Sequence, residues 1–500
     1  MRKFSVILSI VFVFAGGCSG GELSRTAAVT AGLPGVFSVK DYGAAGDGEA
    51  LDNAAINEAI KQCTASGGGT VYFPAGTYLS GSIRLKSNVT LHLSVGATIL
   101  GASNDIGAYD PPEDNPFDMY QDFGHSHWRN SLIWGEGLEN IAITGLGTID
   151  GGGMTAGRYG GKGSEPDPGG GDKTIALKLC KNILIRDITI RHAGHFAVLA
   201  TGCDNMTIDN VKIDTQRDGI NLDCCRNVRV SNCSINSPHD DALCPKSSYG
   251  LGFKRATENV TITNCVVSGY KEGTMLDGTF IGGEGTGRIK FGTESNGGFK
   301  NIVIDNCVFD RCRGIALEIV DGGIMENISI SNITMRDVAN PPIFIRLGNR
   351  ARGPNEPPVG KIRNINISNI LATGVDATSG VLILGIPGHP VEDVRLSNIK
   401  IIYKGGGTKE DAKIVPPELE DGYPEPSKFG RIPAYGFYCR HVKGLELHNV
   451  EVGFEAEDLR PALICDDVED LELDNFKAER AAGNESLIVL KNVRNLKIRD

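Results

Sequence analysis

The 500-residue sequence contains few aromatic residues (6%) and lacks long apolar runs after its first residues. A protein that crosses a membrane several times needs many such runs, so this class is excluded. Hydrophobic residues make up 40% of the chain, which is near the globular norm and excludes a disordered chain. The 66 glycines are scattered and do not indicate collagen. A chain of this size and composition can bury a large core.

Basic residues are not in excess either, because the formal net charge is −11. This balance argues against a nucleic-acid partner, and it means that an acidic substrate must be held by a local cluster of cations. The thirteen cysteines do not show the spacing of a small disulfide scaffold or of a zinc site.

The single long apolar run lies in Met1 to Ser19, where two cations precede the apolar residues 4–14. This pattern is typical of an export signal that is too short to remain as a membrane span. The small residues before Cys18 resemble a bacterial lipobox, in which the cysteine is acylated. We therefore expect residues 1–18 to be a lipoprotein-type signal, and the protein to lie in the periplasm or to be an outer-membrane lipoprotein of a Gram-negative bacterium, with a lipid anchor as its only membrane contact. Because Ala15 stands where a bulky aliphatic residue is usual, ordinary cleavage and soluble secretion are the alternative.

One pattern recurs along most of the chain: a short alternating strand, a polar corner and a second short strand. Clear copies are DNMTIDNVKI from Asp204, RNVRVSNCSI from Arg226 and KNIVIDNCVF from Lys300. The copies follow one another at steps of about 22 to 50 residues, and such small units bury their apolar faces only by stacking. Helical patterns are nearly absent between the strands. The sequence therefore predicts an all-β fold, a right-handed parallel β-helix that forms a single domain over residues 36–500.

Two positions of the repeat have a clear expected role. One position holds asparagine in most copies, and we predict that these amides form a hydrogen-bonded ladder at a corner of the stack. The next position is apolar and holds cysteine in three copies, so these cysteines are expected to be buried thiols. An amphipathic segment near Asp52 to Ser66 predicts a short N-terminal helix that covers the open end of the stack. The predicted ladder consists of Asn210, Asn232, Asn264, Asn306, Asn332, Asn369, Asn398, Asn449 and Asn475.

Acidic residues stand at equivalent places on consecutive repeats, in RDGINLD and SPHDDALCPKS. Asp218 and Asp240 are 22 residues apart, which is one coil, so Asp218, Asp240 and Asp241 are expected to cluster on one face. Glycoside hydrolysis needs one protonated carboxyl group and one ionised carboxylate, and clustered aspartates supply both states. Calcium binding by the same three carboxylates, or corner acids that merely stack, are the alternatives.

Several motifs together resemble glycoside hydrolase family 28, the polygalacturonase family, over nearly the whole mature chain. They are VKDYGAAGDG, GGGTVYFPAGTY, the repeats, RDGINLD and HDDALCPKS. The resemblance implies hydrolysis of pectic glycosides with inversion, by three aspartates and without a metal or other cofactor. It implies that Asp240 is the general acid and that Asp218 and Asp241 position the attacking water. The family's N-T-D motif falls on residues 216–218, of which only the aspartate matches, and Lys246 matches a lysine that commonly follows the pair.

Other family motifs are changed. The histidine of the G-H-G motif falls on Arg288, and the two cations of the R-I-K motif fall on Ala316 and Glu318. The string RIK occurs one repeat earlier, where Arg288 and Lys290 point to the same side of a strand and could hold a substrate carboxylate. Since Glu318 adds an anion, the expected substrate is a pectic fragment with a different sugar at one subsite, such as a rhamnogalacturonan oligosaccharide, or a substituted galacturonide.

Further binding candidates lie outside these motifs. His195 precedes Asp218 by one coil and is a candidate substrate contact. Arg346, with Arg350 and Arg352, forms a cation cluster that either binds a uronate or is a solvated turn.

Two long insertions, from Gly101 and from Gly151, carry Tyr120, Trp128 and Tyr159, which could stack on sugars. If these loops close one end of a cleft, the enzyme is exo-acting; alternatively, they only cover the stack.

Two other functions remain open from the sequence. A calcium-dependent pectate-type lyase would use the aspartates to bind calcium and Arg288 as the base. A non-catalytic surface β-helix would bind a glycan without cleaving it.

Overall fold

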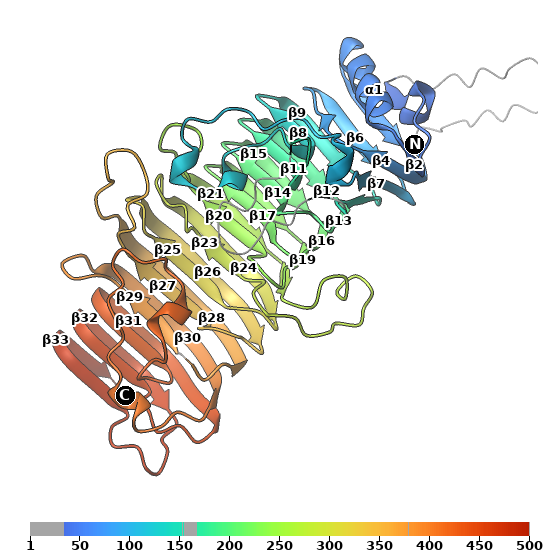
Figure 1. Ribbon diagram of the computed structural model, residues 1–500. Coiled ribbons are helices and arrows are strands. Elements are labelled where there is room, and N and C mark those ends of the chain that lie inside the picture. Colours follow the sequence, from blue (N-terminus) through green and yellow to red (C-terminus); the bar gives the residue numbers. More distant parts are fainter. Residues whose placement is uncertain (1–34, 153, 155–167, 379, 500) are drawn as a thin grey trace, which may run out of the picture. The chain divides into compact units, whose positions relative to one another are not determined.

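A computed structural model describes residues 35–152, 154, 168–378 and 380–499. The predicted export signal and Cys18 lie outside these residues. The described chain is a right-handed parallel β-helix, as the repeats predict, in which each strand pairs in parallel with strands one coil away (Figure 1). Within the described residues, no helix has the length and apolarity needed to cross a membrane.

Three columns of paired strands form the sides of the stack. The first column contains β5 (Ile83–Arg84), β8 (Ser131–Glu136), β11 (Lys173–Lys178), β14 (Phe196–Thr201), β17 (Asp218–Asp223), β20 (Leu243–Lys246), β23 (Ile289–Phe291), β25 (Ile315–Ile319), β27 (Ile343–Leu347) and β29 (Val381–Leu384). The second contains β1 (Val36–Ser38), β3 (Gly69–Phe73), β6 (Val89–Leu93), β9 (Glu139–Thr144), β12 (Lys181–Arg186), β15 (Asp204–Asp209), β18 (Arg226–Ser231) and β21 (Thr257–Thr263). The third contains β2 (Asp47–Leu51), β4 (Gly76–Ser80), β7 (Ala97–Gly101), β10 (Thr148–Asp150), β13 (Thr189–Arg191), β16 (Lys212–Asp214), β19 (Ser234–Asn236) and β22 (Val266–Ser268).

Toward the C-terminus, strands turn a corner without a break and so belong to more than one column. These strands are β24 (Phe299–Asp310), β26 (Ile324–Arg336), β28 (Lys361–Val375), β30 (Val391–Gly405), β31 (Phe437–Ala456), β32 (Leu463–Ala478) and β33 (Ile488–Arg499). Short 3₁₀ helices lie at η1 (Val39–Tyr42), η2 (Asn104–Ile106), η3 (Asp118–Tyr120), η4 (Phe123–His125), η5 (Asp411–Lys413) and η6 (Pro426–Phe429).

The interior of the stack is filled by the inward-facing residues of the alternating strands. In successive coils of the second column, Ile183, Met206, Val228 and Val260 lie in register and are all buried. The helix α1 (Asn53–Ala65) packs Ile56, Ile60 and neighbouring apolar residues against the first strands, and so covers the N-terminal end as predicted. Twelve cysteines from Cys63 to Cys465 are buried thiols, which confirms that the repeat cysteines serve as small apolar residues.

Asparagines form ladders at two corners of the stack. In the predicted ladder, Asn398 donates to Asn369 at 3.0 Å, and Asn449 donates to Asn398 at 2.8 Å. A second ladder, which the sequence analysis missed, includes Asn227, which donates to Asn205 at 3.2 Å. These residues have φ near +55°, a left-handed conformation that asparagine tolerates better than most residues. Asparagine therefore makes the corner turn and also bonds one coil to the next.

Candidate active site

Three aspartates lie together on the first column. Asp218 begins β17, while Asp240 and Asp241 lie in the turn that leads from β19 into β20. The backbone N–H of Asp241 donates to Oδ1 of Asp218 at 3.2 Å and to Oδ1 of Asp240 at 3.1 Å. A single N–H group thus joins carboxylates from two neighbouring coils. The structure therefore brings together the three carboxylates that the one-coil spacing selects.

The surroundings of these aspartates differ. Asp218 and Asp241 are each 3% exposed. The side chain of Asp240 is 26% exposed, so solvent or a ligand reaches this carboxylate most readily.

Two cations hold Asp241 in its ionised form. Burial alone would raise the pKa of Asp241, but Arg288 and Lys290 outweigh it and hold this pKa well below its ordinary value. The Arg288 Nε lies 2.7 Å from Asp241 Oδ1, and the Lys290 Nζ lies 3.4 Å from Oδ2. Asp241 is therefore ionised at neutral pH.

Asp218 is shifted in the opposite direction. Burial and then the nearby charge of Asp240 raise the pKa of Asp218 well above its ordinary value, although Lys246 partly opposes them. The carboxyl groups of Asp218 and Asp241, which lie on neighbouring coils, thus favour different protonation states. Such a pair is the arrangement that acid–base chemistry requires.

The predicted binding cations are already engaged by protein groups. Besides Asp241, Arg288 Nη2 donates to Glu425 Oε2 at 2.9 Å, and Lys290 Nζ donates to the Tyr423 hydroxyl at 3.1 Å. Lys246 lies one coil upstream of the Arg288 strand and donates to Glu294 at 3.0 Å. All three cations are nearly buried, and their positive charges act to lower the pKa values of the neighbouring buried aspartates.

Glu318, the acid predicted to discourage a uronate, lies fully buried on β25. Neither of its carboxylate oxygens has a hydrogen-bond partner, and its nearest cation is Lys290, at 4.0 Å. Burial raises the pKa of Glu318 to about 7. Its carboxyl group is therefore protonated for part of the time at neutral pH and repels an anion less than an ionised glutamate would.

Arg217 links the site to the preceding coil. Its Nε donates to Asp240 Oδ2 at 2.8 Å, and its Nη2 lies 3.2 Å from His195 Nε2. Burial and then the charge of Arg217 lower the pKa of His195 well below its ordinary value, so this ring is neutral and its Nε2 can accept. The ring of His195 stacks on Phe196, with ring centres 4.1 Å apart. In the sequence, position 217 is only one of the departures from the N-T-D motif at residues 216–218, and nothing there indicates this contact.

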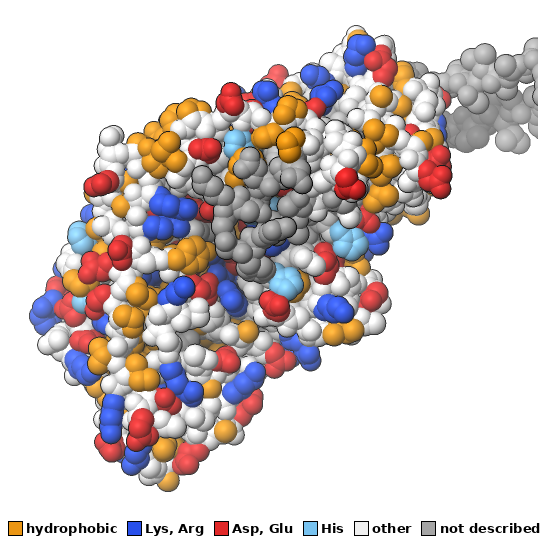
Figure 2. Space-filling model, in the orientation of Figure 1, with side chains coloured by type: hydrophobic (Ala, Val, Ile, Leu, Met, Phe, Trp, Pro, Cys, Tyr) orange, Lys and Arg blue, Asp and Glu red, His pale blue; other side chains and the backbone are white. Residues whose placement is uncertain are grey.

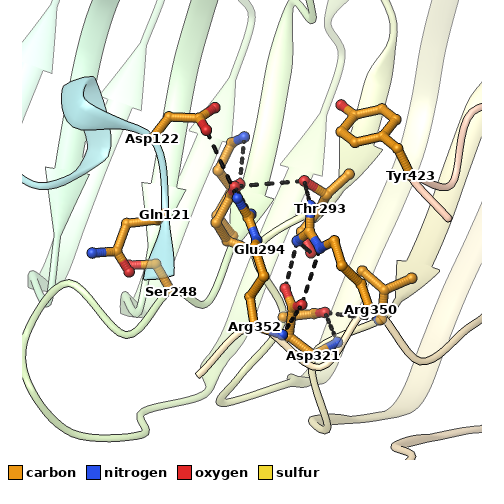
Figure 3. A network of polar contacts seen from close by, with 12 residues as sticks. Gln121, Asp122, Ser248, Thr293, Glu294, Asp321, Arg350, Arg352 and Tyr423 are labelled. Carbon is orange, nitrogen blue, oxygen red and sulfur yellow. Dashed lines mark hydrogen bonds and ion pairs between the residues drawn. The ribbon is translucent and has the colours of Figure 1, made fainter. Parts of the chain in front are cut away.

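Arg350 and Arg352 are not a solvated turn, because both bind buried carboxylates (Figure 3). Arg350 is held by both oxygens of Asp321. Arg352 donates to Glu294 at 2.6 Å and also lies 3.7 Å from Asp122, which belongs to the loop after β7. This network joins loops from distant parts of the sequence beside the carboxylate site.

The loop between β7 and β8, residues 102–130, covers the outer face of the first column upstream of the aspartates. Trp128 is 1% exposed and packs on Phe196 and Leu199, and its Nε1 donates to Thr201 at 3.0 Å. Its ring therefore faces protein, which is at odds with the predicted stacking on a sugar. Tyr120 packs edge-on against Tyr249, and Tyr159 lies outside the described residues.

A second covering, which we call the strap, consists of residues 406–436 between β30 and β31. Arg346 is 1% exposed and donates to the carbonyl oxygens of Glu418 and Leu419 at 2.7 and 2.8 Å. The predicted substrate contact of Arg346 would thus require the strap to move, because the strap occupies its guanidinium group. The strap also packs apolar residues on the outer face: Phe429, Ile432 and Ala434 contact the cluster of Ala316, Phe344, Leu382, Leu384, Tyr438 and Ile464.

The strap supplies Tyr423 and Glu425 to the site, and the sequence analysis missed both. The sequence did indicate an insertion here, because the repeats at Glu392 and Lys443 are 51 residues apart, far more than one coil.

Side chains of both charge signs are interspersed over the visible face of the molecule and form no broad basic surface (Figure 2).

Among the described residues, two groups of side chains have the spacing of metal ligands. One is Asp218, Asp241 and Cys244, and the other is Asp122, His125 and Glu294. Both fit a divalent cation poorly. In the first group Asp241 is already paired with two cations, and in the second Glu294 is paired with Lys246 and Arg352.

Comparison with known proteins agrees with this geometry. The sequence matches the profile of "Glycosyl hydrolases family 28" over residues 63–419. A probable polygalacturonase from Vitis vinifera is 29% identical over 391 residues, which cover 73% of this chain and 74% of that protein. An exopolygalacturonase from Platanus acerifolia is 25% identical over 387 residues, which cover 74% and 91% of the two chains.

Among solved structures, the hyperthermoactive exopolygalacturonase from Thermotoga maritima superposes with a TM-score of 0.64 at 20% identity. The match covers 83% of this chain and 91% of that one, and it shows the shared fold.

Proposed function

The chain belongs to glycosyl hydrolases family 28 and is a glycosidase of the polygalacturonase type; from this premise, we propose that it hydrolyses a galacturonic-acid-containing pectic chain by an inverting, metal-independent mechanism. The observation that carries the proposal is the opposite pKa shift of Asp218 and Asp241, which are joined by a hydrogen bond from the Asp241 N–H to Asp218 Oδ1 beside the more exposed Asp240.

In this mechanism Asp240 donates a proton to the leaving glycosidic oxygen. Asp218 and Asp241 orient a water molecule on the opposite face of the sugar, and a carboxylate takes its proton as the C–O bond breaks. The more exposed position of Asp240 suits contact with the leaving group, while the cations beside Asp241 keep that carboxylate ionised, so it can accept a hydrogen bond from the water.

The proposed substrate is a short pectic chain or a chain end. The upstream loop and the strap cover the outer face on both sides of the aspartates, which limits the coils that a sugar chain can reach. Since Ala316 and Glu318 replace two cations, a rhamnogalacturonan oligosaccharide or a substituted galacturonide is the favoured class. Because the loop of residues 102–130 and the strap limit access in this way, both support exo action.

The lyase alternative is less well supported. A lyase needs a neutral base, but Arg288 is paired with Asp241 and Glu425. Although burial would lower the pKa of Arg288, these carboxylates raise it well above its ordinary value. The guanidinium group is therefore a poor proton acceptor.

Product analysis tests the proposal. Purified protein is incubated with chelator and with polygalacturonan or rhamnogalacturonan oligosaccharides. We expect saturated products, with a loss of about 100-fold or more in kcat for Asp240→Asn. Asp466→Asn is the matched control, because Asp466 belongs to another aspartate pair, on β32. Unsaturated products that absorb in the ultraviolet would instead indicate a lyase, and binding without products would indicate a glycan-binding protein.

We also propose that the protein is exported and anchored through Cys18, because the leader has the composition of a lipoprotein signal. Cell fractionation tests this. The wild type should be found with the membranes and Cys18→Ala in a soluble fraction, whereas equal membrane association would contradict the anchor.

A further inference from the structure

Arg217 occupies the carboxylate to which the proposed mechanism assigns the role of general acid. The Arg217 Nε donates to Asp240 Oδ2 at 2.8 Å, so this oxygen is engaged as a hydrogen-bond acceptor. A general acid must instead carry a proton when the substrate reacts. The contact is well defined: the Arg217 side chain is 14% exposed, and the neutral His195 ring fixes its other end. Something must therefore remove Arg217 from Asp240 before the bond is cleaved.

We infer that a carboxylate of the substrate takes Arg217 away from Asp240, so that Arg217 selects a free uronate and couples its binding to formation of the general acid. This inference rests on the hydrolase function proposed above. A uronate carboxylate has the same charge and geometry as the Asp240 carboxylate, so it is the substrate group best suited to compete with Asp240 for the guanidinium group of Arg217. A neutral sugar or a methyl ester carries no negative charge and competes poorly.

The proton that Asp240 needs is available next to it. Asp218 favours its protonated form, and its carboxyl group lies beside Asp240 across the Asp241 N–H. Once the uronate has taken Arg217, the proton moves from Asp218 to Asp240, which leaves Asp218 ionised. Asp240 then protonates the leaving oxygen while Asp218 takes a proton from the attacking water. The cycle ends with Asp218 protonated and Asp240 ionised, as it began, and the net change is the addition of one water molecule across the glycosidic bond.

Arg217→Gln tests the inference with matched pairs of substrates: oligogalacturonides and rhamnogalacturonan oligosaccharides, each as the free acid and as the methyl ester. We expect the wild type to prefer the free acid. The variant should lose at least about tenfold in kcat/KM on the free acid, the value of one charge-assisted hydrogen bond, while keeping or gaining kcat on the ester. Arg217→Lys should retain part of the preference, and Arg311→Gln, an exposed arginine, should behave as wild type.

An equal loss on both forms by a folded Arg217→Gln would overturn the inference but leave the hydrolase function intact. Cleavage of neither form by the wild type would instead overturn the proposed function, and the inference with it. A second measurement does not depend on the folding of Arg217→Gln. Galacturonic acid, which cannot be cleaved, should bind Asp240→Asn more tightly than wild type, because the neutral amide competes less strongly for Arg217 than a carboxylate does, whereas its methyl ester should bind both equally. Equal affinities for the free acid would contradict the inference.

Discussion

Asp218 and Asp241 lie on neighbouring coils, joined by a 3.2 Å hydrogen bond from the Asp241 N–H to Asp218 Oδ1, and their pKa values are shifted in opposite directions. The difference arises from their partners. Asp241 contacts Arg288 and Lys290, whereas Asp218 is buried beside another aspartate. Two carboxyl groups in one small site can therefore hold different charges at the same pH.

Replacing Asp218 by asparagine should abolish activity but stabilise the fold at alkaline pH. The pKa of Asp218 is raised in the folded state, so its stabilising contribution is present below its unfolded pKa and is lost as pH rises through the folded value. An amide cannot ionise and avoids this loss. We expect Asp218→Asn to melt about 1–3 °C above wild type at pH 8, with the gap closing toward pH 4. Thermal melts over this pH range check the sign, and a lower melting temperature at pH 8 would contradict it.

Removing Arg288 should shift the acid side of the pH–activity profile. Asp241 must be ionised to act, and its pKa is low because of Arg288 and Lys290, which outweigh the effect of burial. In Arg288→Gln the pKa of Asp241 rises. The acid limb of the pH–activity profile should therefore move to higher pH. The profile of kcat/KM against pH measures this, with Arg311→Gln as the control. An unmoved acid limb would show that Asp241 does not titrate there.

Arg346 should hold the strap in place. Its guanidinium group donates to three backbone carbonyl oxygens, two of them in the strap, and Arg346→Met leaves these acceptors without a partner at about 1–3 kcal/mol each. We expect faster protease cleavage within residues 406–436 and longer products from a polymeric substrate. The control is Arg395→Met, an exposed residue paired with Glu446. Unchanged proteolysis would mean that apolar packing alone secures the strap.

The corner ladder should depend on both the shape and the amide of asparagine. Asn398 has φ near +54°, donates to Asn369 and accepts from Asn449. Asn398→Ala loses both bonds and also strains the left-handed corner, at about 1–2 kcal/mol for the strain alone. Asn398→Gly loses the bonds but not the conformation. Alanine should therefore lower the melting temperature more than glycine. The reverse order would show that the left-handed backbone conformation is not the reason why asparagine stabilises the corner.

The β-helix and the clustering of the aspartates were predictable, because both follow from the regular spacing of the sequence repeat. The corner asparagines and the buried cysteines recur at fixed positions, so their environment could be inferred from any copy. The partners of the site were harder to predict. Glu425 and Tyr423 come from an insertion 137 residues after Arg288 and 133 after Lys290, where no repeat position exists to fix the register. The burial of Trp128 was missed for the same reason, since a loop's aromatic residue can face either solvent or protein.

The strap also constrains how this stack can change in evolution. A parallel stack tolerates the gain or loss of whole coils, because each coil contacts only its neighbours. The strap leaves the stack after β30 but reaches back to Arg288 and Lys290 on the coil of β23. Inserting or deleting a coil between these strands would separate Tyr423 and Glu425 from their cations. The coils from β23 to β31 must therefore be inherited as one block.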